Sequence, residues 1–312
     1  MWYQSPRSLG AVGSTGSNSA ALIPGNDIAG RVTTVGDEVD DLDENTAVIV
    51  APGVSCGHCR PCLSGQDHHC RQYSILGEHR NGGYAEYVVV PRTNVFLKPK
   101  ALSFTQAAAI GIPFLTAWHM LTARAQLKAG ETLLVQAAGS GVGSAAIQIG
   151  KYLGAQVITT AGTDAKLTRA KALGADHGIN YTQESVATRV KKLTDGGADV
   201  VFEHVGAATW EDSMRSLAWY GRLVTCGATT GATASINLKH LFYKSLSILG
   251  STMGSKGEFT ELLALFERKH LRAVVDRVMP LADAAEAHRL LETRQIFGKI
   301  VLTPTDPRDV PA

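Results

Sequence analysis

The sequence lacks the features that mark membrane, secreted and nucleic-acid-binding proteins. No apolar run approaches the ~18 residues that a membrane-spanning helix needs, and the first residues contain no apolar core of a secretory signal. The formal net charge is only +2 over 312 residues, without a basic stripe interleaved with aromatic side chains, so no nucleic-acid partner is predicted. We therefore expect a cytoplasmic protein that binds neither membrane nor nucleic acid.

Cysteine is scarce, but its distribution is informative. The chain has five cysteines, and four of them lie at Cys56, Cys59, Cys62 and Cys70. In a reducing compartment this clustering points to a metal ion rather than to disulfides. The spacing C-x2-C-x2-C-x7-C lets one loop wrap four thiolates around a tetrahedral ion and leaves no open coordination position. We predict a structural Zn²⁺ site, with a redox pair or a disulfide as the alternative.

Length and composition describe a globular protein of about two domains. Hydrophobic residues make up 45% of the chain and charged residues 19%, as in ordinary soluble folds. Residues 1–21 differ from the rest because they are rich in serine and glycine and show no periodicity. We expect this segment to be loose and assign no function to it.

The most informative stretch runs from Glu131 to Thr163. An apolar strand is followed by a glycine-rich turn, an alanine- and isoleucine-rich helix and a second strand, which is the first βαβ unit of a dinucleotide-binding fold. Glycines let the backbone approach a pyrophosphate, whose charge is favoured at the helix N-terminus. A strict G-x-G-x-x-G motif would need glycine where Ser144 stands, and a turn that serves packing alone is the alternative. The predicted cofactor contacts in this turn are Gly139, Ser140, Gly141, Val142 and Gly143.

The alternation of strands and helices continues, with predicted strands at 198–206, 221–227 and 246–252. Each run has glycine at its carboxyl end, where open α/β sheets bind ligands. His204 lies near one of these ends, as either a cofactor contact or a structural residue. Further cofactor contacts are predicted at Val205, Gly206, Gly227, Gly250 and Ser251.

Several segments resemble one known family. Residues 23–36 resemble the Gly-His-Glu-x-x-Gly-x-Val stretch of the medium-chain, zinc-binding alcohol dehydrogenase superfamily, and the resemblance continues to the C-terminus. The four-cysteine segment resembles the structural zinc lobe of that family. Residues 75–90 alternate like a strand and resemble its Gly-Gly-Tyr-Ala-Glu-Tyr-Val segment. The second half is most similar to the quinone oxidoreductase branch.

The resemblance implies an α/β fold of two domains. A GroES-like β domain would comprise 22–115 and 281–312 and carry the zinc lobe at 56–70, while a doubly wound parallel sheet of Rossmann type would be inserted at 116–280. The run ahead of Pro24 does not resemble the first strands of the family, so we expect a shortened N-terminus. The resemblance also implies a small-molecule substrate and a homodimer or homotetramer.

The end of the second strand of the βαβ unit bears on the choice between NAD and NADP. An NAD-specific site places Asp or Glu there to bind the ribose hydroxyls, but Ala161 occupies that position and Thr163 follows. Lys166 and Tyr181 stand at the spacing seen in NADPH-dependent quinone oxidoreductases, although Lys166 also fits an ordinary helix-surface lysine. These residues favour NADP(H). The resemblance adds Thr116, in a segment that the family places near the nicotinamide.

The sequence departs from the metal-using members of the family at the reacting centre. Asn26 and Asp27 stand where a zinc-binding His and its neighbouring Glu are expected, and Ile112 stands where a Cys or Asp ligand is expected. An asparagine amide is a poor zinc ligand and isoleucine is none. We therefore expect zinc to be structural only, interpret Asp27 as a turn residue that caps local backbone, and assign no catalytic residue.

Together these features predict an oxidoreductase that transfers a hydride from NADPH to a carbonyl or activated alkene, such as a quinone or an enone. Two alternatives stay open. One is a non-catalytic NADP(H)-binding protein with a disabled pocket, and the other is a metal-dependent alcohol dehydrogenase.

Overall fold

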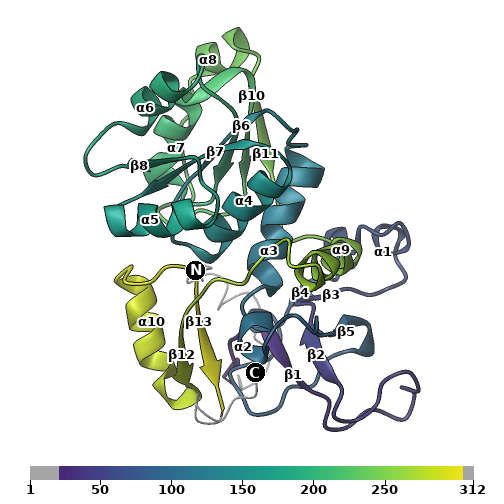
Figure 1. The fold of residues 1–312 in the computed structure, drawn as a ribbon. Coiled ribbons are helices and arrows are strands. Elements are labelled where there is room, and N and C mark those ends of the chain that lie inside the picture. Colours follow the sequence, from purple (N-terminus) through teal and green to yellow (C-terminus); the bar gives the residue numbers. More distant parts are fainter. Residues whose placement is uncertain (1–20, 305–312) are drawn as a thin grey trace.

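The computed structural model describes residues 21–304. The expectation of a loose segment at 1–21 therefore lies, except for its last residue, outside the described residues. Figure 1 shows a large parallel sheet with its helices in the upper half and smaller sheets in the lower half, with helix α3 (Gly111–His119) running between them. No helix within residues 21–304 is long and apolar enough to cross a membrane.

The upper half is built on a six-stranded sheet with the order β11-β10-β9-β6-β7-β8. Every neighbouring pair in it is parallel. Its central strands consist mostly of apolar residues and are buried on both faces, which is typical of parallel sheets covered by helices. The strands are β6 (Thr132–Val135), β7 (Gln156–Ala161), β8 (His177–Asn180), β9 (Ala198–Glu203), β10 (Leu217–Thr225) and β11 (Ser247–Gly250).

Most helices of the upper half begin at polar capping residues, and the exception is α7 (Ala207–Arg215), whose N-cap is Gly206. Ser140, Thr163 and Ser185 each accept a hydrogen bond from a backbone N–H of the helix that follows. Such caps satisfy N–H groups that have no partner inside the helix and fix where each helix begins. The helices are α4 (Gly141–Tyr152), α5 (Asp164–Ala172), α6 (Val186–Leu193), α7 (Ala207–Arg215) and α8 (Leu238–Tyr243).

The lower half consists of three small sheets. Strands β1 and β5 flank β2 in an antiparallel sheet, β3 pairs with β4, and β12 pairs in parallel with β13. The strands are β1 (Ile28–Arg31), β2 (Ala47–Val50), β3 (Gly53–Val54), β4 (Ser74–Ile75), β5 (Val95–Leu97), β12 (Val275–Pro280) and β13 (Lys299–Thr303). The helices are α1 (Arg60–Leu63), α2 (Phe104–Ala107) and α10 (Ala284–Glu292).

Helix α9 (Lys256–Glu267) joins the two halves. Its Phe266 packs edge-on against Phe114 of α3 at 4.9 Å between ring centroids, and its Phe259 packs against Phe96 of β5 at 5.3 Å. The apolar spacing along α9 therefore serves packing against α3 and the lower sheet, next to which the helix lies in Figure 1.

The expected strand at 75–90 is wrong over most of its length. Only Ser74–Ile75 forms a strand, Leu76 and Arg80 form an isolated bridge, and residues 84–90 form no strand within the described part of the chain. Tyr87 is 72% exposed and Val89 is 97% exposed. Alternating residues make a strand only where a neighbouring strand satisfies the backbone, and no described strand pairs with residues 84–90.

Candidate functional site

The predicted cofactor contacts lie along one edge of the large sheet. Because all six strands are parallel, their carboxyl ends face the same way. The glycine turn follows β6, Ala161 ends β7 and Gly250 ends β11. The remaining predicted contacts at this edge are Thr163 after β7, Tyr181 after β8, Val205 and Gly206 after β9, Gly227 after β10 and Ser251 after β11.

The glycine turn presents the N-terminus of α4 to this edge. Ser140 is the N-cap, and its hydroxyl accepts a hydrogen bond from Gly143 N at 2.9 Å. A side chain at Gly143 would place its Cβ 2.4 Å from Ala137 O. Ala137 itself has φ of +54°, a strained conformation of the kind that clusters at ligand sites. The free N–H groups and the positive end of the helix dipole suit a diphosphate.

The segment before β13 folds over this turn. Gly298 N donates to Gly139 O at 2.8 Å. A Cβ on Gly139 would lie 3.4 Å from the ring of Phe297 and 3.3 Å from Lys166 Cδ. A Cβ on Gly141 would lie 3.0 Å from Lys299 Cδ. Glycine at these positions therefore allows three side chains from elsewhere in the fold to approach the turn.

Lys166 and Tyr181 both lie beside the loops at the end of β7. Lys166 Nζ donates to Arg294 O at 2.6 Å, and burial together with the nearby Arg294 charge lowers the pKa of Lys166. The Tyr181 hydroxyl lies 2.7 Å from where a Cβ on Gly162 would be. Sequence reasoning missed Arg294, which follows α10 and is 128 residues from Lys166.

Glu203, at the end of β9, organises the next loop along the edge. Its side chain is fully buried and accepts hydrogen bonds from Val205 N at 2.6 Å and Gly206 N at 3.1 Å. The hydroxyls of Thr209 and Ser213 donate to its other oxygen. The buried carboxylate therefore fixes the backbone of two predicted cofactor contacts. Sequence reasoning missed this role.

His204, whose role the sequence left open, links that loop to the glycine turn. Its Nε2 lies 3.0 Å from Gln136 O and 3.2 Å from Ser140 Oγ. Burial lowers its pKa, so the ring is neutral. The contacts favour the structural interpretation.

Two predicted contacts have buried hydroxyls that lack a protein partner within residues 21–304. Thr116 Oγ1 and Ser251 Oγ are buried without a hydrogen-bond partner in the described structure. Buried hydroxyls are rarely left unpaired, so these two atoms fit a bound polar group. Pro113, one turn before Thr116, lies beside the start of α4, since a Cβ on Gly141 would be 3.3 Å from its Cγ.

Asn26 and Asp27 are held by protein groups. Asn26 Nδ2 donates to Leu76 O at 2.8 Å. Asp27 Oδ1 accepts from Ile112 N at 2.6 Å and Oδ2 accepts from Lys299 Nζ at 2.7 Å. The expected local cap is wrong, because Asp27 accepts a hydrogen bond from backbone 85 residues away. The residue is also half of an ion pair with Lys299, beside the glycine turn.

Tyr84 lies close to this ion pair and was missed by the sequence reasoning. Its hydroxyl is 3.2 Å from His288 Nε2. Burial raises the pKa of Tyr84, Lys299 lowers it and Asp27 raises it, with a net increase. The phenol is therefore neutral and carries a proton. A side chain at Gly25 would collide with the Tyr84 ring at 2.5 Å, which explains the glycine before Asn26.

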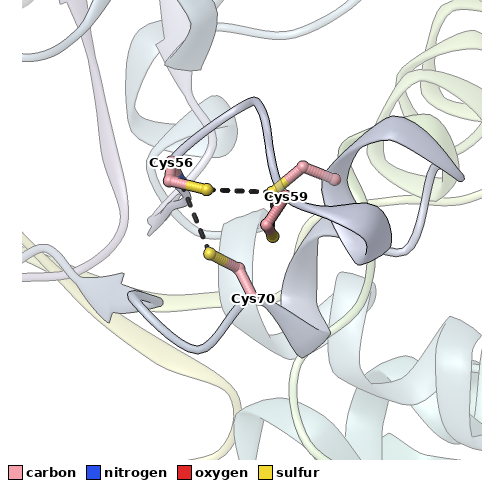
Figure 2. Close-up of side chains that lie close together, drawn as sticks. Cys56, Cys59 and Cys70 are labelled. Carbon is pink, nitrogen blue, oxygen red and sulfur yellow. Dashed lines mark hydrogen bonds between the residues drawn. The ribbon is translucent and has the colours of Figure 1, made fainter.

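The structure brings the four predicted cysteines together in one loop, and Figure 2 shows Cys56, Cys59 and Cys70 of this group. The four sulfur atoms all lie within 4.8 Å of one another, and within residues 21–304 no other group of three or more His, Cys, Asp or Glu meets that criterion. Backbone N–H groups of His58 and Cys59 lower the pKa of Cys56 to about 6. Four sulfurs at this spacing fit a tetrahedral metal ion such as zinc.

The fold and the site together define a dinucleotide-dependent dehydrogenase with a four-cysteine metal lobe. The alcohol dehydrogenase GroES-like domain family matches residues 7–100, and the zinc-binding dehydrogenase family matches residues 141–268. The chain belongs to the medium-chain dehydrogenase/reductase superfamily and is an oxidoreductase.

Relatives include both alcohol dehydrogenases and quinone oxidoreductases. An NAD-dependent alcohol dehydrogenase of Sulfurisphaera tokodaii is 32% identical, over 90% of this chain and 81% of the relative. A quinone oxidoreductase of Pseudomonas aeruginosa is 37% identical, over 72% of each chain. A crystal structure of an NAD-dependent alcohol dehydrogenase has a TM-score of 0.88 and 48% identity, and covers 91% of this chain and 83% of that one.

Proposed function

We propose that the protein transfers a hydride from NADPH to a carbonyl or an activated alkene, with quinones and enones as the favoured acceptors. The observation that carries the proposal is the set of residues at the carboxyl end of β7. Ala161 offers no carboxylate there, while Lys166 and Tyr181 border the loops that follow. The side chain of Arg294 is exposed near Lys166 and adds a second positive charge. A 2′-phosphate is favoured by such charges, whereas the 2′-hydroxyl of NAD usually bonds to a carboxylate.

The chain's own residues would bind and orient the cofactor. In this proposal the glycine turn and the start of α4 bind the diphosphate, while the loop fixed by Glu203 and the hydroxyls of Thr116 and Ser251 line the path of the nicotinamide half. The cofactor supplies the hydride. Lys299 lies beside the turn, and Tyr84 retains its proton near Lys299. We assign no proton donor among them.

We propose that the metal has a structural role only. The four cysteines form a closed set of ligands, and both oxygens of Asp27 already have partners. We also propose that the protein is located in the cytoplasm, because a site of four thiolates requires a reducing compartment that keeps the cysteines reduced.

We propose that each chain has two domains, one at 22–115 plus 281–312 and the other at 116–280. The proposed assembly of these chains is a homodimer or homotetramer. Strand β11 is at the edge of the large sheet, and exposed apolar side chains gather on the neighbouring segments. Contiguous apolar surface of this kind marks association sites. The side chains of this set are Trp219, Tyr220, Leu238, Phe242 and Tyr243.

The test is to measure oxidation of NADPH and NADH by the purified chain against quinones, enones and aldehydes. We expect turnover with quinones or enones and a preference for NADPH. Tight NADPH binding without any turnover would instead select a non-catalytic binding protein. Aldehyde turnover that a chelator abolishes would select a metal-dependent alcohol dehydrogenase.

A further inference from the structure

We propose that Asp67 couples the four-cysteine metal site to the cofactor site, so that metal binding and NADPH binding strengthen each other. The inference rests on the proposed function for the identity of the cofactor. Its structural basis is a set of contacts between the metal loop and α9, a helix that follows the last strand of the large sheet.

Asp67 reaches out of the metal loop to the start of α9. It lies between Cys62 and Cys70 and is 7% exposed. Its Oδ1 accepts a hydrogen bond from Lys256 N at 3.0 Å, across 189 residues of sequence, and its Oδ2 lies 3.8 Å from Lys256 Nζ. Lys256 is the first residue of α9. The carboxylate therefore satisfies a helix N–H that has no intrahelical partner and faces the positive end of the helix dipole.

The same end of α9 is held by a capping box. Ser255 Oγ accepts from Glu258 N at 3.2 Å, and Glu258 Oε2 accepts from Ser255 N at 2.7 Å. Glu258 also bonds His119 Nδ1 of α3 at 2.9 Å, and the ring of His68 packs on His119 at 4.5 Å. Through Asp67 and His68, the metal loop therefore becomes part of one polar junction with α9 and α3.

Because of His68, the contact between the metal loop and α9 depends on the conformation of that loop. Both of its ring nitrogens are buried without a hydrogen-bond partner in the described structure. A buried polar group left unpaired opposes docking, so packing and the Asp67 contacts have to keep the loop in place. Another polar contact between this region and the start of α9 is the hydrogen bond from Lys256 Nζ to Ser55 Oγ at 3.4 Å.

The junction continues into the cofactor edge. Ser251, a predicted cofactor contact, is five residues before Lys256. Between them Met253 is fully buried, and a Cβ on Gly254 would lie 2.7 Å from Leu115 Cδ1, next to Thr116. The stretch from Ser251 to Lys256 is thus packed against α3, so a shift at the start of α9 displaces the residues that would bind the nicotinamide half.

A metal ion fixes the loop that carries Asp67, because Cys62 and Cys70 flank it. Without the ion, the binding free energy that orders such a loop is lost. Coupling between two binding sites is reciprocal, so a metal that favours cofactor binding is itself favoured by the cofactor to the same extent.

The experiment measures the apparent zinc Kd by competition with a chromogenic chelator, with and without saturating NADPH. We expect NADPH to tighten zinc binding about 5-fold or more in the wild-type chain. Asp67→Ala is expected to retain one zinc per chain in the absence of the competing chelator but to lose the NADPH effect. Asp67→Asn, which keeps an oxygen acceptor, should recover part of it. Gln66→Ala is the matched control, because that exposed side chain lies in the same loop.

Two results would overturn the inference. One is a wild-type chain that binds NADPH while its zinc Kd is unchanged, and the other is an Asp67→Ala variant that keeps the full NADPH effect. Failure of the wild-type chain to bind NADPH would instead overturn the proposed function. In that case hydrogen exchange of the backbone amides at 256–267 tests only the docking of the metal loop on α9. Zinc removal should speed this exchange in the wild type and have little effect in Asp67→Ala. Unchanged exchange in the wild type after zinc removal would overturn the docking as well.

Discussion

At the scale of single residues, Asp27 has the most consequence for the chemistry. It occupies the position where metal-using relatives are expected to have an acidic residue, yet its carboxylate is paired with Lys299 and with the backbone of Ile112. Its side chain is 7% exposed and that of Lys299 is 31% exposed. A carboxylate this buried depends on its partner, because an unpaired buried charge is costly.

Replacing Lys299 by Met should therefore destabilise the fold by about 2 kcal/mol, since Asp27 would remain buried with one partner fewer. The free energy of unfolding from urea denaturation measures the effect. Adding Asp27→Asn should recover part of the loss, because the uncompensated charge disappears. Arg289→Met, which breaks an exposed ion pair with Glu286, is the control and should change little. Equal losses of stability in Lys299→Met and Arg289→Met would contradict the conclusion that buried Asp27 depends on its ion pair.

Lys166 tests the cofactor preference at the same scale. Lys166→Ala should raise the Kd of NADPH about 10-fold or more, because a hydrogen bond to a charged group contributes ~1.5–3 kcal/mol. The Kd of NADH should hardly change. Titration of cofactor fluorescence gives both values. Lys171→Ala, on the exposed side of the same helix α5, should leave both Kd values unchanged. An equal increase in the Kd of NADH and of NADPH would show that Lys166 supports the fold and does not bind the 2′-phosphate.

At the scale of elements, the βαβ unit and the metal lobe were predictable because their patterns are local. Strand, glycine turn, helix and strand occupy 131–163 in the expected order, and four cysteines within one loop can only lie close together. The strand expected at 75–90 failed for the opposite reason, since strand formation depends on a distant partner. The role of Lys166 stays a prediction from local spacing, whereas its neighbour Arg294 is 128 residues away and no local pattern pairs the two.

The turn of that βαβ unit makes a sharp prediction. In Gly143→Ala, the new Cβ would lie 2.4 Å from Ala137 O and 2.8 Å from the capping Ser140 Oγ, so the start of α4 must shift. We expect about 1–3 kcal/mol lower stability, as for other overpacked sites, and a larger relative loss in NADPH affinity. Thermal unfolding and a binding titration check both effects. Gly36→Ala, in open space, should be neutral in each. Normal NADPH affinity in Gly143→Ala would contradict a diphosphate at this turn.

At the scale of the whole molecule, contacts around the site join residues far apart in the chain, both within the lower half and at the start of α9. Lys299 reaches Asp27 across 272 residues, and Lys256 reaches Asp67 across 189. A single sequence contains no pattern that pairs such residues, so the site between the halves could not be assembled from local motifs. The family resemblance predicted the fold, whereas these two long-range residue contacts are known only from the structure.

The exposed apolar side chains around α8 test the proposed assembly. Phe242→Asp should shift the chain from oligomer to monomer in analytical ultracentrifugation, because a charge there has to be buried when two copies meet. Leu97→Asp is the control, since it changes another exposed apolar residue on the lower sheet. An unchanged oligomer in Phe242→Asp, or an equal effect of both variants, would place the interface elsewhere.

The central claim is that the chain reduces its acceptor with NADPH and uses zinc only in the four-cysteine lobe. The most direct test measures NADPH-dependent quinone reduction and zinc content on the same purified sample. We predict turnover at one zinc per chain and no gain in rate when more zinc is added. Turnover that appears only in samples with two zinc ions per chain would contradict the claim.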